Sequence, residues 1–81
     1  MNVKLFVKDH CPRCPAAKRA CEGLDAVEVY DVASIDGLAE ASFFGVLATP
    51  TLLVLDSHGQ EVAGWRGEPP RREALLEVLA Q

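Results

Sequence analysis

The sequence predicts an α/β protein with the order β-α-β-α-β-β-α, in which one four-stranded mixed sheet is flanked by three helices. Three observations lead to this prediction. Strand-like and helix-like segments alternate through the first half of the chain, and a tight turn joins two strand-like segments in the second half. The chain has 81 residues, of which 49% are apolar, which suits one hydrophobic core. We therefore expect a single domain over residues 1–81.

The first strand is predicted over residues 3–8, where β-branched and aromatic residues partly alternate with lysines. A helix follows, and Pro12 suits its first turn. If Cys11 were the N-cap, Pro15 would lack the N–H for the first helical hydrogen bond, so the regular helix is expected to begin after Cys11. Cys14 lies one turn ahead of the predicted core-facing residues, which recur at helical spacing: Ala17, Ala20, Cys21 and Leu24.

The second strand is predicted over residues 27–32, and Ser34 is a suitable N-cap for a second helix that ends at Gly45. The apolar surface of that helix is expected to come from Leu38, Ala41, Phe43 and Phe44. Residues 51–55 form an almost continuous apolar run after a proline, which is typical of a central strand buried on both faces.

A short turn, Ser57-His58-Gly59, then leads into a hairpin partner strand over residues 60–66. Pro69 and Pro70 introduce the last helix, whose core-facing residues are predicted to be Leu75, Leu76 and Leu79. Right-handed crossovers make the first two strands parallel, and the tight turn makes the last two antiparallel.

Composition excludes several classes of function. A net charge of −4 argues against nucleic-acid binding, which normally needs a basic face. No apolar run approaches the roughly 20 residues of a membrane helix, and no export leader precedes the first strand, so we expect a cytoplasmic protein without a membrane partner. Three cysteines are an odd number, which argues against a disulfide framework.

The chemistry centres on Cys11-Pro12-Arg13-Cys14, at the junction of the first strand and helix. A thiol–disulfide exchanger needs an exposed cysteine of lowered pKa and a second thiol close enough to resolve the mixed disulfide. Cys11, before the helix, would be the exposed one, and Cys14 the more buried one. Positive charge favours the thiolate and clusters at Lys8, Arg13, Lys18 and Arg19, although a solvated helix face is an equally reasonable interpretation. His10 either contributes to this potential or is an exposed loop histidine.

Two other functions remain open from the residues alone. A metal site usually needs a second Cys/His pair, and the other candidates are Cys21, His10 and His58. Cys21 lies too far along the helix from Cys14 to bridge to it, and a small core residue is the better interpretation. A Zn²⁺ ion or Fe–S cluster would therefore have to be shared by the cysteine pairs of two chains, and no metal ligand is assigned within one chain. The third possibility is a binding adapter that makes no redox use of the pair.

Three stretches together resemble the thioredoxin-like superfamily. They are the Cys-Pro-Arg-Cys motif after the first strand, Thr49-Pro50-Thr51 before the third strand, and Gly64 to Gly67 at the end of the fourth. The small size and the Cys-Pro-x-Cys form are similar to glutaredoxins and short glutaredoxin-like thioredoxins. The resemblance implies a thioredoxin-like fold, with Cys11 as nucleophile, Cys14 as resolving cysteine and Pro50 as a cis-proline facing the pair.

The resemblance also implies the other site residues. Thr49 would offer backbone groups to an extended substrate. Pro12 and Arg13, between the cysteines, would contact substrate, and Arg13 and His10 would tune the thiolate. Lys8 could contact a glutathione carboxylate, as a lysine near this position does in glutaredoxins.

The implied function is thiol–disulfide exchange on protein or low-molecular-weight disulfides by a monomer. It uses a Cys11–Cys14 redox disulfide and no bound cofactor. The reductant would be a thioredoxin-reductase-type partner or glutathione. The chain departs from thioredoxins at His10 and Pro12-Arg13, where they carry Trp and Gly-Pro. It departs from glutaredoxins at Gly67-Glu68-Pro69, in place of their Gly-Gly and acidic cap, which puts glutathione dependence in question.

Overall fold

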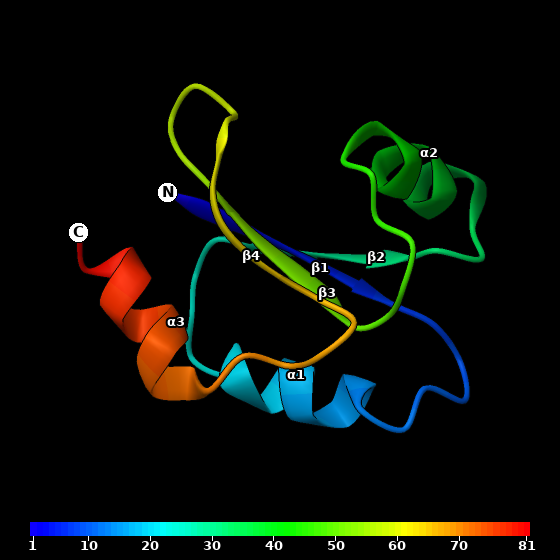
Figure 1. Ribbon diagram of the computed structural model, residues 1–81, viewed down its shortest axis with the longest axis horizontal. Helices are drawn as coiled ribbons and strands as arrows, with labels where there is room; N and C mark the ends of the chain where they lie inside the picture. The colour runs from blue at the N-terminus through cyan, green and yellow to red at the C-terminus, as the bar shows by residue number, and fades with distance from the viewer.

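The computed structural model describes residues 1–81 and contains one four-stranded sheet in the order β2-β1-β3-β4 (Figure 1). The strands are β1 (Asn2–Val7), β2 (Val27–Asp31), β3 (Thr51–Leu55) and β4 (Glu61–Arg66). β1 and β2 are parallel, whereas β3 is antiparallel to both β1 and β4. The predicted order of elements and the mixed sheet are therefore confirmed, with strand ends that differ by one residue at most.

Three helices cover the two faces of the sheet: α1 (Cys14–Ala20), α2 (Ile35–Phe43) and α3 (Arg72–Leu79). α1 and α3 lie on one face and α2 on the other (Figure 1). α1 has Arg13 as N-cap, which puts Pro15 at the second helical position, where no N–H is needed. The helix thus begins after Cys11, as expected from the prolines.

The sheet divides the core into two layers because alternate side chains of a strand point to opposite faces. Toward α1 and α3 the buried residues include Leu5, Leu52 and Val54, which pack with Ala17 and Leu75. Toward α2 the layer is smaller and is formed by Phe6, Ala41, Val46, Leu53 and Leu55. Every residue of β3 is buried, which confirms the prediction of a central strand covered on both faces.

Two details of the predicted helix faces are wrong. In α3, Leu75 is fully buried and Leu79 is partly buried, but Leu76 is 39% exposed because its position in the helical turn directs it away from the sheet. In α2, Ala41 is buried and Phe44 packs against the smaller layer, whereas Leu38 and Phe43 are exposed.

One lysine is largely buried in the layer beneath α2. The side chain of Lys4 is 12% exposed, and its Nζ donates to the Tyr30 hydroxyl at 2.9 Å and lies 3.4 Å from Glu28 and 3.3 Å from Glu40. Burial alone would lower the pKa of Lys4, but the hydrogen bonds to Tyr30, Glu40 and Glu28 outweigh it and hold the pKa above its ordinary value. This charge is therefore compensated within the fold.

Candidate active site

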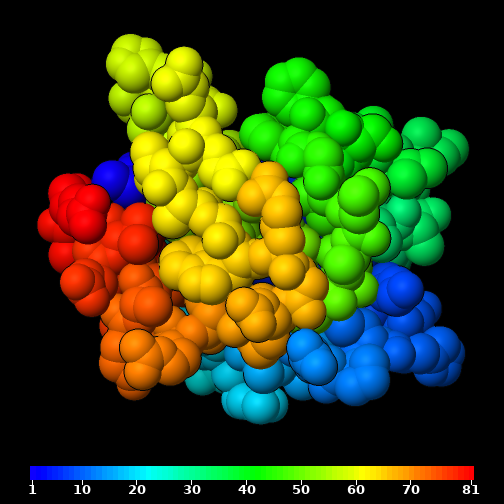
Figure 2. All heavy atoms as spheres, viewed as in Figure 1, coloured from blue at the N-terminus to red at the C-terminus, as the bar shows by residue number.

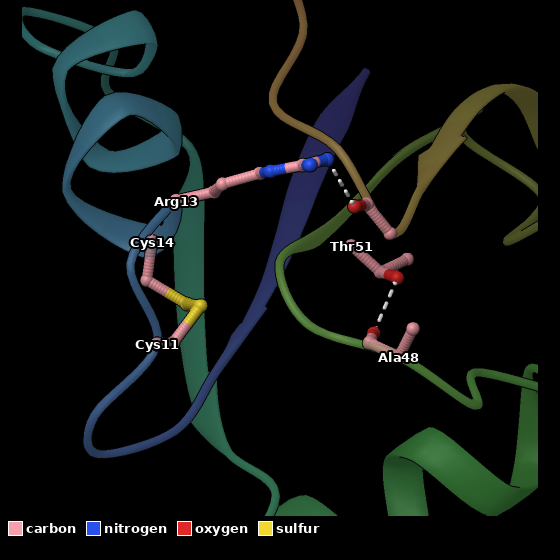
Figure 3. Close-up of a disulfide and its surroundings, with 6 residues drawn as sticks. Cys11, Arg13, Cys14, Ala48 and Thr51 are labelled. Carbon is pink, nitrogen blue, oxygen red and sulfur yellow. Dashed lines mark hydrogen bonds between the residues drawn. A yellow bond between two sulfur atoms is a disulfide. The ribbon is translucent and has the colours of Figure 1, made fainter.

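The two cysteines of the Cys-Pro-Arg-Cys motif are joined in a disulfide (Figure 3). Their Cα atoms are 5.4 Å apart, which is an ordinary separation for bridged cysteines. Cys14 is the first residue of α1, and its N–H donates to the Cys11 carbonyl at 3.3 Å. The start of the helix thus sets the separation of the pair.

The two cysteine residues differ in their burial. Cys14 is 4% exposed and belongs to the core cluster that contains Ala17, because it begins the face of α1 that packs on the sheet. Cys11 precedes the helix and is only partly buried. The expected difference between an accessible Cys11 and a buried Cys14 is present.

The segment before β3 lies across from the disulfide (Figure 3). The Thr49–Pro50 peptide bond is cis, as the resemblance implies. The Thr51 hydroxyl donates to the Ala48 carbonyl at 2.8 Å, and the Gly67 N–H donates to the Pro50 carbonyl at 2.9 Å. The first hydrogen bond fixes the segment to the start of β3, and the second fixes it to the segment after β4.

Thr49 itself has unused hydrogen-bonding groups. Its backbone N–H and C=O make no hydrogen bond within the chain, and its buried hydroxyl has no partner. An unpaired backbone donor and acceptor at a strand entrance are available to an extended peptide. Thr49 also lines a cavity of about 340 Å³ beside α2, to which Lys8 contributes.

Arg13 connects the motif to the segment after β4. Its Nη1 donates to the Gly67 carbonyl at 3.5 Å, across 54 positions of sequence. Figure 2 shows the segment after β4 (orange) beside the segment before β3 (green) and next to the start of α1 (blue). Gly67 has a φ of +83°, which favours glycine, and it joins both neighbours through Arg13 and Pro50. In the sequence, Gly67 is recognisable only as a glycine at the end of a strand, and nothing there indicates its contacts with Arg13 and Pro50.

A second hollow lies on the other side of the motif. It has a volume of about 520 Å³ and is lined by both cysteines together with Lys8, Asp9, His10, Pro12, Pro15 and Lys18. His10 is exposed and has a φ of +59°, an uncommon backbone conformation for a residue with a side chain. The structure therefore brings Lys8, His10 and Pro12 to the disulfide, and the segment that contains Thr49 and Pro50 lies across from it. Arg13 lies between the cysteines, and its side chain extends to Gly67.

The third cysteine takes no part in this site. Cys21 is a free thiol, 8% exposed, in the core beneath α1, as predicted. Burial raises the pKa of the Cys21 thiol, against a smaller opposing effect of Arg72. No group of three or more His, Cys, Asp or Glu residues is placed to hold a metal ion within one chain. No helix has the length and apolar character needed to cross a membrane.

Known proteins resemble this chain over nearly its whole length. No protein-family model matches it. A thioredoxin of Methanocaldococcus jannaschii is 33% identical to it, over 98% of this chain and 92% of that protein.

Solved structures extend the comparison. A thioredoxin from Thermus thermophilus is 27% identical with a TM-score of 0.65, over 96% of this chain and 70% of that one. The glutaredoxin-like NrdH-redoxin of Escherichia coli is 26% identical with a TM-score of 0.65, over 96% and 95% of the two chains. Thioredoxin 1 of Thermosipho africanus, at 23% identity and a TM-score of 0.70 over the full length of both chains, shares the fold. With its Cys11–Cys14 disulfide, the chain belongs to the thioredoxin family and is a thiol–disulfide oxidoreductase.

Proposed function

We propose that the protein is a protein-disulfide reductase in which Cys11 attacks the substrate and Cys14 resolves the intermediate. The observation that carries this proposal is the difference in burial between the two bonded cysteines, since the less buried residue is the one that a second protein can reach. The attacking group must be a thiolate, and positive groups nearby stabilise that form. We assign this role to His10, which directly precedes Cys11, and to Arg13, which lies between the two cysteines in the motif.

The exchange takes two steps. The Cys11 thiolate attacks one sulfur of the substrate disulfide, so a Cys11–substrate bond forms, the substrate S–S bond breaks and one substrate thiolate leaves. Cys14 then loses its proton and attacks the Cys11 sulfur. The Cys11–Cys14 bond forms again, the mixed disulfide breaks, and the second substrate thiol is released. Two electrons have moved from the protein to the substrate, and a reductant must return them.

The substrate would lie as an extended segment between the disulfide and the segment before β3. There the free N–H and C=O of Thr49 can pair with its backbone, in the manner of an added strand. Pro50, which is fully buried, would fix the position of Thr49, and Pro12 and Arg13 would contact the substrate from the side of the disulfide. The hydrogen bond between Gly67 and Pro50 would hold the segment before β3 in place without the substrate.

For the electron donor we propose a thioredoxin-reductase-type partner rather than glutathione. The Escherichia coli NrdH-redoxin is described as glutaredoxin-like with a thioredoxin-like activity profile. This chain has Gly67-Glu68-Pro69 where glutaredoxins have their Gly-Gly and acidic cap. We propose that the protein acts as a monomer of one domain and without an organic cofactor. We also propose that it is cytoplasmic, since a dithiol reductant suits a reducing compartment.

Cysteine variants test the assignment of roles. Reduced Cys14→Ser should accumulate a mixed disulfide with insulin or a disulfide-bonded peptide, detected as an adduct by mass spectrometry. Cys11→Ser should form none and should lose reductase activity, while Cys21→Ser, the matched control, should keep it. A Cys11→Ser protein that reduced insulin at the wild-type rate would rule out the proposed mechanism.

The donor is tested by turnover of the wild-type protein with NADPH. One assay contains thioredoxin reductase, and the other contains glutathione and glutathione reductase. We expect turnover in the first to exceed that in the second. The reverse order would favour glutathione as the reductant and Lys8 as a contact for its carboxylate.

A further inference from the structure

The basic residues beside the disulfide form no ion pair within the protein. The chain has eight Lys and Arg residues, and its ion pairs involve only Lys4 and Arg66. Asp9, the acid closest to the cysteine pair in sequence, lines the same hollow as Lys8 and Lys18 but forms no ion pair. The basic residues around the motif are all exposed and also have none: Lys8, Arg13, Lys18 and Arg19. Their charges are available to a partner.

Three of these residues surround the cysteine pair. Lys8 and Lys18 line the hollow of about 520 Å³ to which both cysteines contribute. Arg13 is no part of that hollow, because its side chain extends toward Gly67 (Figure 3). Positive charge therefore stands on two different sides of the disulfide. We call Lys8, Arg13 and Lys18 the basic rim.

The contact that holds Arg13 in the free protein is weak. The Arg13 guanidinium has one hydrogen bond, to the neutral Gly67 carbonyl, at the long distance of 3.5 Å. Its other N–H donors have no partner, and a carboxylate can engage two of them at once. A carboxylate on the substrate would therefore replace the Gly67 contact with a stronger one.

We infer that the basic rim selects disulfides flanked by acidic residues, so that the substrate is an extended segment with Asp or Glu beside the attacked cysteine. This inference rests on the proposed reductase function and names its substrate class. The net charge of the whole protein is −4, so the rim is positive on an otherwise acidic molecule. Such an arrangement attracts an acidic segment to the disulfide and repels it elsewhere, which raises the rate of productive encounter.

Peptides of matched sequence provide the test. Three peptides would each carry one cysteine in a mixed disulfide with uncharged 2-mercaptoethanol, flanked by Glu, Gln or Lys. Fully reduced protein is mixed with each peptide in a single turnover, and the released peptide thiol is measured by mass spectrometry. No reductase is present, so the choice of electron donor cannot affect the result. At low ionic strength the rate constant for the Glu peptide should exceed that for the Lys peptide roughly tenfold.

The ratio of the Glu rate to the Lys rate isolates recognition, because any change in the reactivity of Cys11 affects both peptides equally. Arg13→Gln and Lys18→Gln should each lower this ratio about threefold, the effect of one exposed ion pair. About 0.5 M salt should bring it close to one. Arg71→Gln is the matched control, because Arg71 is an exposed arginine at the start of α3 and does not line the hollow, and it should leave the ratio unchanged.

Two outcomes would overturn the inference, and they can be told apart. If the Gln peptide is reduced but the Glu and Lys peptides react equally, or if the Arg13 and Lys18 variants keep the wild-type ratio, the substrate class is wrong and the reductase function stands. If no peptide is reduced, the proposed function itself fails, and the substrate class fails with it.

Discussion

Gly37 at the start of α2 is a position where a better helix former should destabilise the protein. It is the third residue after the N-cap Ser34, and it is buried. A Cβ placed on Gly37 would overlap the backbone carbonyl of Asp31 and lie 2.9 Å from Ser34 Oγ. The Ser34 hydroxyl accepts from the Gly37 N–H at 2.9 Å and donates to the Asp31 carbonyl at 2.7 Å. Gly37→Ala must therefore disturb both contacts.

The size of the effect follows from opposing terms. Ala is favoured over Gly within a helix by about 1 kcal/mol. Against this, forcing a methyl group into packed backbone costs about 1–3 kcal/mol. Loss of the Ser34 cap costs about 1 kcal/mol, and loss of its hydrogen bond to Asp31 costs about 1 kcal/mol more. The overlap with backbone outweighs helix propensity, and we expect a net loss of about 2–4 kcal/mol in the free energy of unfolding.

Urea and thermal unfolding followed by circular dichroism measure this loss. For a chain of this size, about 2–4 kcal/mol corresponds to a fall in Tm of at least about 10 °C. Gly59→Ala is the matched control, because Gly59 has a φ of +78° but no atom lies within 4 Å of the position that its Cβ would take. Its cost should be about 1 kcal/mol, from backbone conformation alone. A Gly37→Ala protein as stable as the wild type would refute the packing argument.

Three further predictions concern stability and redox potential. Leu75→Ala should cost about 2–5 kcal/mol in urea unfolding and Leu76→Ala under about 1 kcal/mol, because only Leu75 is fully buried, and equal losses would contradict the observed face of α3. The hydrogen bond from Arg66 lowers the pKa of Glu61, so this pair stabilises the fold above the ordinary glutamate pKa and the stabilisation is lost as the pH falls through the lowered value. Glu61→Gln should therefore weaken the fall of stability below the ordinary glutamate pKa in acid titrations, and an unchanged profile would contradict the pairing. Arg13→Gly should make the cysteine pair more reducing in a redox-buffer titration, whereas a potential at or above the wild-type value would exclude thiolate stabilisation by Arg13.

Local patterns in the sequence were sufficient for the order of the elements. The apolar run of residues 51–55 fits a central strand, since buried strands lack alternation, and all of it is buried. Ala17, Ala20 and Cys21 recur at helical spacing, which predicts one face of a helix, and all three are buried in the structure. Helical spacing did not predict which of the adjacent residues Leu75 and Leu76 is buried. The two are neighbours on the helix, and only the placement of α3 against the sheet decides which of them is covered.

The part of the site formed by the cysteine motif was predictable, because its geometry depends on residues close together in the sequence. The spacing of Cys11 and Cys14 at a helix start fixed both their separation and their difference in burial. The contact between Arg13 and Gly67 was not predictable, because it joins positions 54 residues apart and exists only once β4 and α1 are both in place. The free backbone of Thr49 is likewise a property of the assembled fold, since a sequence shows which groups exist and not which remain unpaired.

Arg13 has two proposed roles, and they can be separated because they act on different quantities. A guanidinium that stabilises the Cys11 thiolate changes the reactivity of the protein toward every disulfide, including one without charge. A guanidinium that binds a substrate carboxylate changes only the rate for acidic substrates, and that change disappears in high salt. The Gln peptide therefore reports the first role and the Glu-to-Lys ratio reports the second. Arg13 makes no ion pair and only one long hydrogen bond, so neither role is blocked by its contacts in the free protein. If Arg13→Gln slows the Gln peptide and leaves the ratio unchanged, Arg13 tunes the cysteine pair, and its assignment to the basic rim is wrong.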